Sequence, residues 1–345
     1  MSARAGLLSG LRPGARKRRR HTRAVIAGSA GLSLVAVILT VGLGEYPVAP
    51  GDVLLALLGH GAPSSSFVVT ELRLPRALAA FGVGAGLAAS GVILQGLTRN
   101  ALAAPELVGV SAGANTAAVV AIVVLPDLPV AVLPVCAFAG ALGASALVYA
   151  LAWRGGSSPS RLLLVGVAIT TLGYAVVLGV ISSVDDIIHA SQLVTFIAGT
   201  VYGRGWTELA TLVPWLALLL PLALLSARDL DSLILGDETA GALGLRLERD
   251  RLRLLAMAAG LAGVAVAVAG PVGFVGLMAP HAARRLVGAN HAAILLTAVM
   301  LGGCLVLVAD ALARTAFAPV DIPVGVVTAI VGAPYLIWLL AARTR

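Results

Sequence analysis

Long apolar runs, separated by short polar or proline- and glycine-rich segments, cover most of this 345-residue chain. A helix that spans a bilayer needs about 20 predominantly apolar residues. A shorter segment, Ser191–Tyr202, is expected to lie at the surface. The pattern predicts an all-α membrane protein with about ten transmembrane helices, at residues 25–44, 73–97, 107–125, 130–152, 161–184, 208–227, 252–270, 272–287, 292–313 and 323–341.

The composition excludes a soluble protein and favours helices over a barrel. Hydrophobic residues make up 59% of the chain and charged residues only 12%, whereas soluble domains carry about 25% charged residues. Barrel strands alternate apolar and polar positions over about ten residues, but the runs here are longer and apolar on all faces. Because unpaired backbone amides are costly in hydrocarbon, such runs must form helices.

The distribution of the net charge of +8 argues against nucleic acid as a partner and predicts an orientation. Eight of the 24 basic residues lie within residues 1–23, directly before the first apolar run. This indicates a basic cytoplasmic tail (residues 1–23) followed by a polytopic membrane domain (residues 24–345). A cleaved signal peptide is the alternative, but the run Val25–Leu43 exceeds the usual length of about 7–15 residues and lacks a cleavage site.

The ten expected spans place both termini in the cytoplasm. Twenty of the 24 basic residues then fall on the inner side, as the positive-inside rule requires. The exceptions on the outer side are Arg73, Arg76, Arg204 and Arg314. We therefore expect a multi-pass protein of the bacterial cell membrane.

The stretch GDETAGALGL, Gly236–Leu245, reads as a short water-facing helix inside the longest internal loop on the inner side, Ala227–Arg251. Asp237 is expected to be the N-cap, followed by Glu238 and Thr239 in the first turn. Gly244 is expected to end the helix in the left-handed conformation. A polar helix at this position is predicted to lie on the inner membrane surface.

The sequence holds no recognisable catalytic or metal-binding motif. Lys17 is the only lysine, so the chain has no Walker A loop and is not itself an ATPase. Cys136 and Cys304 lie alone in apolar runs and are expected to be buried small residues, without a disulfide or metal site. We expect no catalytic residue, no metal site and no cofactor in this chain.

Among the Asp, Glu and His residues, His281 and Asp310 are the two that lie in the interior of expected spans. Asp310 precedes Arg314 by one helical turn, which favours a local ion pair over a proton relay. His281, in APHAARR, is interpreted as a structural histidine. Proton-coupled carriers usually bury carboxylates near the middle of the bilayer, and the scarcity of such residues here counts against an ion-gradient-driven carrier.

The outer arginines have two interpretations. Arg73, Arg76 and Arg314 would either snorkel to lipid phosphates or dock an acidic partner.

The glycines of the second span are expected to allow close helix packing. The stretch GPVGFVG, Gly270–Gly276, differs because it should interrupt its span with irregular backbone that is buried or lines a cavity. The segments at 85–91 and 259–265 resemble each other only faintly.

Several blocks together resemble the FecCD family, the permeases of importers for iron-siderophores, haem and cobalamin. The longest block is RLPRALAAFGVGAGLAASGVILQGLTRNALAAPELVGVSAGAN, Arg73–Asn115. SRLLLVGVA, GDETAGALGL, AGPVGFVGLMAPHAARRLVG, ADALART and IPVGVVTAIVGAPYLIWLL follow in family order over roughly residues 45–342. One departure is Glu106, which stands where glycine is common in the family.

The resemblance implies a type II ABC importer permease fold with an inverted repeat, and it implies partners. These are a second permease subunit, identical or not, two cytoplasmic ATPases that hydrolyse ATP, a substrate-binding protein outside the membrane, and membrane lipid. It also implies site residues. Coupling to the ATPase falls on the loop at about 228–251, with Gly236, Asp237, Glu238, Thr239, Ala242, Leu243 and Gly244.

By the same resemblance, Arg73, Arg76 and Arg314 would meet glutamates of the binding protein, and Ser157, Ser158, Pro159 and Ser160 would form a cytoplasmic gate. The small residues Ala240, Gly241 and Ala242 would allow close packing against the ATPase. The implied function is the permease subunit of an ATP-driven importer, with iron-siderophore complexes as the default cargo. A carrier driven by an ion gradient is the alternative.

Overall fold

The architecture of the protein is described by a computed structural model, which covers residues 2–44, 47–125, 128, 132–152, 159–184, 187–316 and 321–343. Within these residues the chain forms helices and connecting turns, without a strand. The helices are α1 (Ser2–Gly42), α2 (Pro50–Leu57), α3 (Pro63–Phe67), the π-helix η1 (Val68–Arg73), α4 (Leu74–Thr98), α5 (Val110–Val124), α6 (Leu133–Ala152), α7 (Pro159–Ser182), α8 (Ile187–Ile197), α9 (Trp206–Leu225), α10 (Ala227–Ile234), α11 (Asp237–Ala242), α12 (Leu247–Ala269), α13 (Val275–Val287), α14 (His291–Thr315) and α15 (Val324–Arg343).

Each of the ten expected spans contains a helix, so the hydropathy pattern predicted the fold class correctly. The ten are α1, α4, α5, α6, α7, α9, α12, α13, α14 and α15. Seven of the described helices are long and apolar enough to cross a membrane, and α5 and α15 hold shorter apolar stretches. The segment expected at the surface forms α8, whose Leu193 is nevertheless buried against Val119 and Val177.

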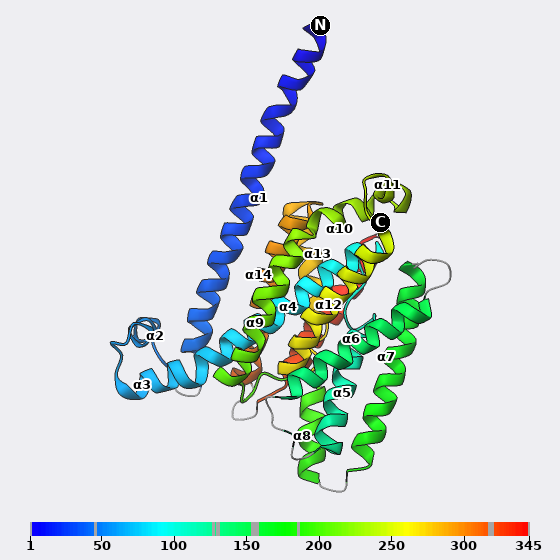
Figure 1. The fold of residues 1–345 in the computed structure, drawn as a ribbon. Coiled ribbons are helices and arrows are strands. Elements are labelled where there is room, and N and C mark those ends of the chain that lie inside the picture. Colours follow the sequence, from blue (N-terminus) through cyan, green and yellow to red (C-terminus); the bar gives the residue numbers. More distant parts are fainter. Residues whose placement is uncertain are drawn as a thin grey trace.

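The helices form one bundle with two distinct ends (Figure 1). α10, α11 and the end of α15 lie at one end, which we call the α11 end. α2 and α3 lie at the opposite end, which we call the α3 end. α1 runs along the side of the bundle, and its N-terminal half extends beyond the α11 end. The basic tail is therefore helical and continuous with the first expected span.

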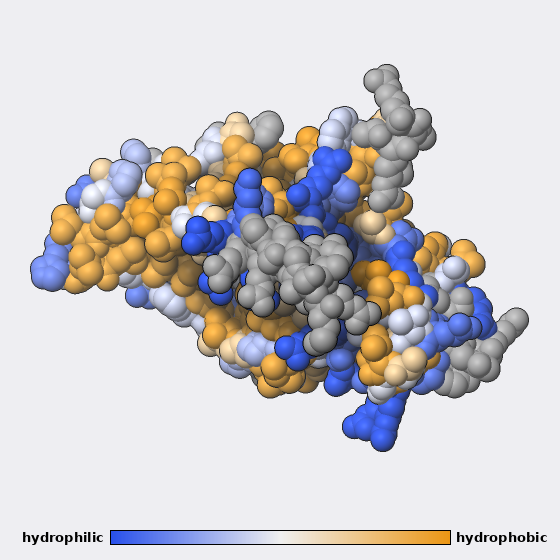
Figure 2. All heavy atoms as spheres, turned by 90° about the horizontal axis from the view of Figure 1, so that it is seen from above, coloured by the Kyte–Doolittle hydropathy of each residue, from blue (hydrophilic) through white to orange (hydrophobic). Residues whose placement is uncertain are grey.

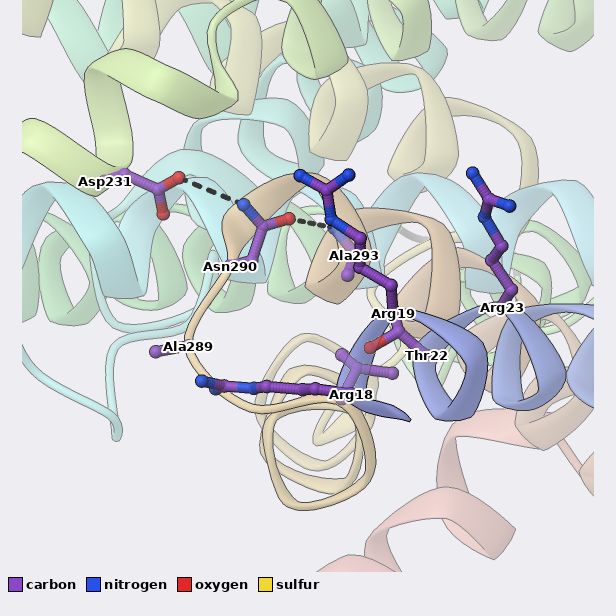
Figure 3. Close-up of a pocket in the computed structure, with 9 residues that line it drawn as sticks. Arg18, Arg19, Thr22, Arg23, Asp231, Ala289, Asn290 and Ala293 are labelled. Carbon is purple, nitrogen blue, oxygen red and sulfur yellow. Dashed lines mark hydrogen bonds between the residues drawn. The ribbon is translucent and has the colours of Figure 1, made fainter. Parts of the chain in front are cut away.

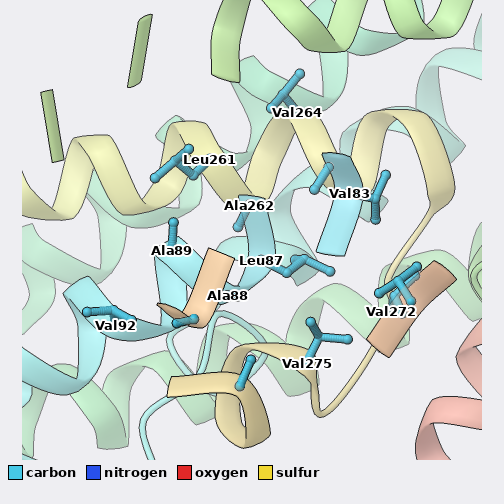
Figure 4. Packing of buried hydrophobic residues seen from close by; sticks show 14 of the residues in the cluster. Val83, Leu87, Ala88, Ala89, Val92, Leu261, Ala262, Val264, Val272 and Val275 are labelled. Atoms are coloured by element: carbon cyan, nitrogen blue, oxygen red, sulfur yellow. The ribbon is translucent and has the colours of Figure 1, made fainter. Parts of the chain in front are cut away.

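The core of the bundle is α4, which packs between α12 and α14. Most of the apolar stretch of α4 and of α12 is buried, whereas α7 and α9 are largely exposed. Figure 4 shows the small side chains of this core, among them Val83 and Ala88 of α4 beside Ala262 of α12. Small side chains allow these helices to approach closely, as the glycine content predicted.

Two glycines of α4 illustrate how close the helices lie. A Cβ atom at Gly84 would overlap the carbonyl oxygen of Gly302 on α14, and one at Gly91 would overlap that of Gly276 on α13. The two faintly similar segments also meet, because a Cβ atom at Gly86 would lie 3.1 Å from the Leu261 carbonyl oxygen. Ser90 Oγ donates to the carbonyl of Ala258, the residue before the second segment, at 2.8 Å. Gly86 lies beside Leu261, so α4 and α12 run antiparallel along this contact.

The predicted break at GPVGFVG is confirmed. α12 ends at Ala269, and α13 begins at Val275 after a non-helical stretch in which Gly270 and Phe274 have φ angles of 69° and 68°. The Thr200 amide donates to the Ala269 carbonyl at 2.7 Å. Val272 is buried, so the irregular backbone is enclosed by protein rather than exposed to lipid.

Candidate functional sites at the two ends of the helix bundle

The short helix α11 forms where the sequence predicted it, with one correction at its start. Gly236, not Asp237, is the N-cap, and it has a φ angle of 109° that side-chain-bearing residues rarely adopt. Asp237 therefore lies in the first turn of α11 and is not the residue that caps the helix.

The predicted end of α11 is confirmed. Gly244 has a φ angle of 95°, and its amide donates to the Gly241 carbonyl at 3.0 Å. The Leu245 amide donates to the Ala240 carbonyl at 3.1 Å. These two hydrogen bonds form a Schellman motif, which explains the glycine at this position.

Asp237 joins α11 to the bundle instead of capping it. Arg251 Nη2 of α12 lies 2.7 Å from Asp237 Oδ1, and Arg99, the residue after α4, donates to the same oxygen. Arg99 also donates to the Leu233 carbonyl of α10 at 2.7 Å. Partial burial opposes ionisation, but the hydrogen bonds from both arginines hold the pKa of Asp237 below its usual value. Asp237 is thus ionised at neutral pH, and its ion pairs with Arg99 and Arg251 hold α11 against the end of α4 and against α12.

Two more pairs hold α10 against the bundle. Asp229 accepts from Arg253 of α12 at 2.5 Å. Asp231 Oδ1 lies 2.6 Å from Nδ1 of His291, the buried first residue of α14. Together with Asp237, these carboxylates connect the α10–α11 segment to α4, α12 and α14. A force applied to this segment would therefore reach the core helices directly.

The side of α10–α11 that faces away from the bundle is both polar and apolar. Leu235 and Leu243 are 63% and 60% exposed, and Glu238, Thr239 and Ala242 are also exposed. We call these residues, with Ile234, the α11 surface. One expectation is corrected: Ala240 is completely buried in this chain, so its small size serves internal packing.

The end of the molecule that holds α11 carries many hydrophilic residues. Figure 2 shows this end from above, with hydrophilic side chains around its middle and apolar side chains on the flanks. A Cβ atom at Gly241 would meet no other atom within 4 Å. Space around α11 is therefore open to a partner that approaches this end.

The expected gate lies mostly outside the described residues. Ser157 and Ser158 fall outside them, and so does the side chain of Pro159, the first residue of α7. Ser160 is exposed in the first turn of α7. The role of these four residues stays a prediction.

At the α3 end, the three outer arginines come together, but each has partners within the chain. Arg76 of α4 forms a two-pronged ion pair with the buried Asp310 of α14, with Nη2–Oδ1 and Nε–Oδ2 distances of 2.8 and 3.2 Å. It also lies 3.2 Å from Asp321 Oδ1 and over the ring of Tyr202. This pairing between distant segments was not expected from the sequence.

Arg73 and Arg314 bind the end of α1. Arg73 Nη1 donates to the Val41 and Gly42 carbonyls, each at 3.2 Å. Arg314 Nη1 donates to the Leu43 carbonyl at 2.9 Å, and its Nη2 donates to Thr40. The last carbonyls of a helix lack partners within the helix and favour cations. These two arginines therefore hold α1 against α4 and α14.

The expected Asp310–Arg314 pair exists but is secondary. Arg314 Nε lies 3.8 Å from Asp310 Oδ2, farther than the nitrogens of Arg76. His281 packs edge-on against Tyr335 of α15, with ring centroids 6.0 Å apart, as a structural histidine would. Cys304 is buried, as expected, whereas Cys136 is half-buried.

The position of one acidic residue, beside the middle of α7, was not expected from the sequence. Glu106 belongs to the non-helical connection between α4 and α5, and its carbonyl accepts from Thr170 in the middle of α7 at 2.9 Å. Its Oε1 atom is buried without a hydrogen-bond partner among the described residues. The departure from the family pattern at this position was the available signal. Ionisable groups at this depth usually have a function.

No group of three His, Cys, Asp or Glu side chains in the described part of the chain could hold a metal ion. The described side chains at the two ends of the bundle form ion pairs and offer surfaces for protein contact. The α11 end carries a partly apolar surface, and ion pairs hold the segment that bears this surface against the bundle. At the α3 end, partly buried arginines join α1, the η1–α4 segment and α14.

Comparisons with known proteins identify the family of this chain. The model of the FecCD transport family matches residues 32–342. The chain is 39% identical over 330 residues to the Fe(3+)-citrate import system permease protein YfmE of Bacillus subtilis, covering 96% of this chain and 98% of that protein. It is 39% identical over 316 residues to a B. subtilis protein named as a siderophore transport system permease, YfhA, with 90% and 92% covered.

A solved structure is also similar. It is described as an inward-facing conformation of a metal-chelate type ABC transporter, and its TM-score with this chain is 0.83 at 28% sequence identity. The match covers 93% of this chain and 99% of that one. The similarity therefore extends over the whole bundle, including both ends.

Proposed function

Because the chain belongs to the FecCD transport family, we propose that it is the permease subunit of an ATP-driven importer of iron-siderophore complexes. The named cargoes of its relatives, ferric citrate and a siderophore, support a bulky ferric chelate rather than a bare ion. The chain would form the translocation path, and a separate ATPase would supply the energy.

The observation that carries this proposal is the α11 surface. It combines exposed Leu235 and Leu243 with the charged Glu238, and ion pairs connect it to three core helices. Exposed apolar side chains with a polar rim are typical of protein interfaces. A cytoplasmic ATPase that binds here could transmit its motion through Asp237 and Arg251 to α12.

The complete assembly that we propose has two permease subunits, two ATPases and a substrate-binding protein. Both termini and the α11 end would face the cytoplasm, in agreement with the basic residues of α1 and the α10–α12 region. The α3 end would face outward, toward the binding protein. Ser157, Ser158, Pro159 and Ser160 would form the gate on the cytoplasmic side.

Reconstituted uptake tests the proposed function. We expect proteoliposomes that contain this chain, its ATPase and its binding protein to accumulate a radiolabelled ferric siderophore only when ATP is supplied. Haem and cobalamin, offered separately, identify the cargo class. Accumulation driven by a proton or sodium gradient without ATP would contradict the proposal and support a secondary carrier.

Among the outer arginines, Arg73 is the best candidate for docking the binding protein. The side chains of Arg76 and Arg314 are only 15% and 12% exposed and are paired with Asp310, whereas the Arg73 guanidinium is less buried than either. We expect Arg73→Glu to slow association with the binding protein about tenfold at low salt, because charges at an interface rim mainly affect the encounter rate.

The matched variant Arg73→Gln separates docking from the contact with α1. If Arg73 docks an acidic partner, Gln should have an intermediate effect, and high salt should reduce the difference between Gln and Glu. If Arg73 only binds the Val41 and Gly42 carbonyls, both variants should lose affinity equally at every salt concentration. The measurement is the association rate of purified binding protein with the reconstituted transporter.

A further inference from the structure

A basic pocket lies at the α11 end, between α1 and the turn that connects α13 to α14 (Figure 3). Its volume is about 680 Å³. Arg18, Arg19 and Arg23 of α1 line one side, and Asp231 of α10 and Asn290 line the other. None of the residues of the α11 surface lines this pocket, which shares only Asp231 with the ion pairs that connect α10–α11 to the core helices.

The single carboxylate of the pocket does not neutralise its arginines. Asp231 Oδ1 lies 2.6 Å from His291 Nδ1 and accepts from the His291 amide at 3.0 Å. Asp231 Oδ2 accepts from Asn290 Nδ2 at 3.4 Å. In the part of the chain that the structure describes, no carboxylate lies within ion-pair distance of Arg18, Arg19 or Arg23. The pocket therefore offers three positive charges to an anion.

Contacts with α13 and α14 hold the pocket in shape. His21 Nε2 lies 3.2 Å from the Leu286 carbonyl at the end of α13. The turn continues through Gly288, whose φ angle is 82° and which lies directly beside the Arg18 guanidinium. Asn290 then caps α14 by accepting from the Ala293 amide at 3.0 Å. The arginines thus face a fixed turn and not open solvent alone.

A separate apolar groove lies farther along α14. It has a volume of about 200 Å³, and Leu220 and Leu224 of α9 face Leu296 and Met300 of α14 across it. Ala293, which lines the basic pocket, precedes Met300 by seven residues, or about 10 Å of helix. The Ser33 hydroxyl of α1 lies 3.7 Å from Met300 Sδ, so α1 flanks the far end of the groove.

We propose that the pocket and the groove together bind an anionic phospholipid, with its phosphate among the three arginines and an acyl chain along α14. Arginine guanidinium groups are well suited to phosphate, and clusters of basic residues beside a span attract anionic lipids. A free phosphate or nucleotide would use the arginines but not the groove. α1 changes from basic to apolar at Ala24, which is the level of a lipid headgroup.

Such a lipid would lie beside Asp231, whose ion pair helps to hold α10 against the bundle. The ion pair Asp231–His291 connects α10 to α14, and the lipid headgroup would lie beside it. A bound lipid would therefore hold α1 and stabilise the segment that carries the α11 surface. This inference does not depend on the proposed function, because it requires only that the chain is inserted in a membrane.

A pair of double variants provides the test. Arg18→Ala/Arg19→Ala removes two charges that line the pocket, and Lys17→Ala/Arg20→Ala removes two exposed charges about half a helical turn away. Native mass spectrometry of the full chain measures the phosphatidylglycerol retained, with phosphatidylcholine as the reference lipid. We expect the first variant to weaken phosphatidylglycerol binding about tenfold and the second less than twofold.

Two further measurements identify the ligand. Leu296→Trp should fill the groove and reduce phosphatidylglycerol binding several-fold, without changing the affinity for inorganic phosphate. Equal losses in both double variants would show diffuse attraction to the basic helix and overturn the proposal. Millimolar inorganic phosphate that displaces the lipid completely, or a Leu296→Trp variant that binds normally, would identify a free-anion site instead. Thermal unfolding of each variant verifies that it is folded.

Discussion

Replacing Ala242 by tryptophan should abolish uptake, while the protein still inserts and folds. Ala242 is exposed in the last turn of α11, and a Cβ atom at the neighbouring Gly241 would meet no other atom of the chain. Because position 242 is exposed, an indole ring there can extend away from the permease. It would, however, add a large rigid group in the middle of the surface that we propose contacts the ATPase.

The expected loss is in association with the ATPase. A single large group that prevents close packing at an interface costs several kcal/mol, and each 1.4 kcal/mol is about tenfold in affinity. We expect the ATPase to dissociate from Ala242→Trp during purification and uptake to fall to background. Glu238→Arg should act in the same direction, but it also places a cation at a helix N-terminus, so it is the less specific variant.

Two neighbouring substitutions serve as controls. Gly241→Ala adds one methyl group in open space and should leave uptake within twofold of the wild type. Ala240→Trp places an indole in a completely buried position and should prevent accumulation of folded protein. Normal uptake by Ala242→Trp, with the ATPase co-purifying as before, would refute the coupling role of this surface.

The sequence predicted the spans well because their signal is local. Each span is an apolar run whose length matches a bilayer, and the structure has a helix in every one. The left-handed Gly244 and the break at Gly270 were also predictable, since glycine and proline determine backbone conformation locally. The N-cap of α11 was misplaced by one residue because Asp237 has distant partners that no local pattern reveals.

The charged clusters could not be predicted because their members lie far apart in the chain. Arg76 and Asp310 are separated by 234 residues, and Arg99 and Asp237 by 138. The sequence offered Asp310 only a neighbour on its own helix, Arg314. Likewise, Glu106 lies just outside the expected span at 107–125, although the structure places it against the middle of α7. Only the packing of α4 brings these groups together.

The largest effect on stability should come from the Arg76–Asp310 pair. The side chains of Asp310 and Arg76 are only 4% and 15% exposed. Asp310→Ala would leave the Arg76 guanidinium partly buried with only the more exposed Asp321 as a partner. Removing one member of a buried ion pair typically costs about 3–5 kcal/mol. We expect a loss of about that size in the free energy of unfolding, measured for the purified protein in detergent.

A carboxylate at the same end of the bundle provides the control. Glu71 of η1 is exposed, so Glu71→Ala should change stability by less than about 0.5 kcal/mol. The double variant Arg76→Met/Asp310→Leu should recover much of the loss, because replacing both charges by apolar groups removes the uncompensated cation.

The stability of Asp310→Ala also decides which outer arginine is suitable for a test of docking. If Asp310→Ala is as stable as the wild type, Arg76 does not depend on its internal partner and is available to dock the binding protein, as the family resemblance implied. If Asp310→Ala is strongly destabilised, a loss of binding in Arg76→Glu would reflect two carboxylates forced together in a buried site. The distances and burial favour the second outcome, so docking is better measured at Arg73, where reversing the charge leaves the Arg76–Asp310 pair intact.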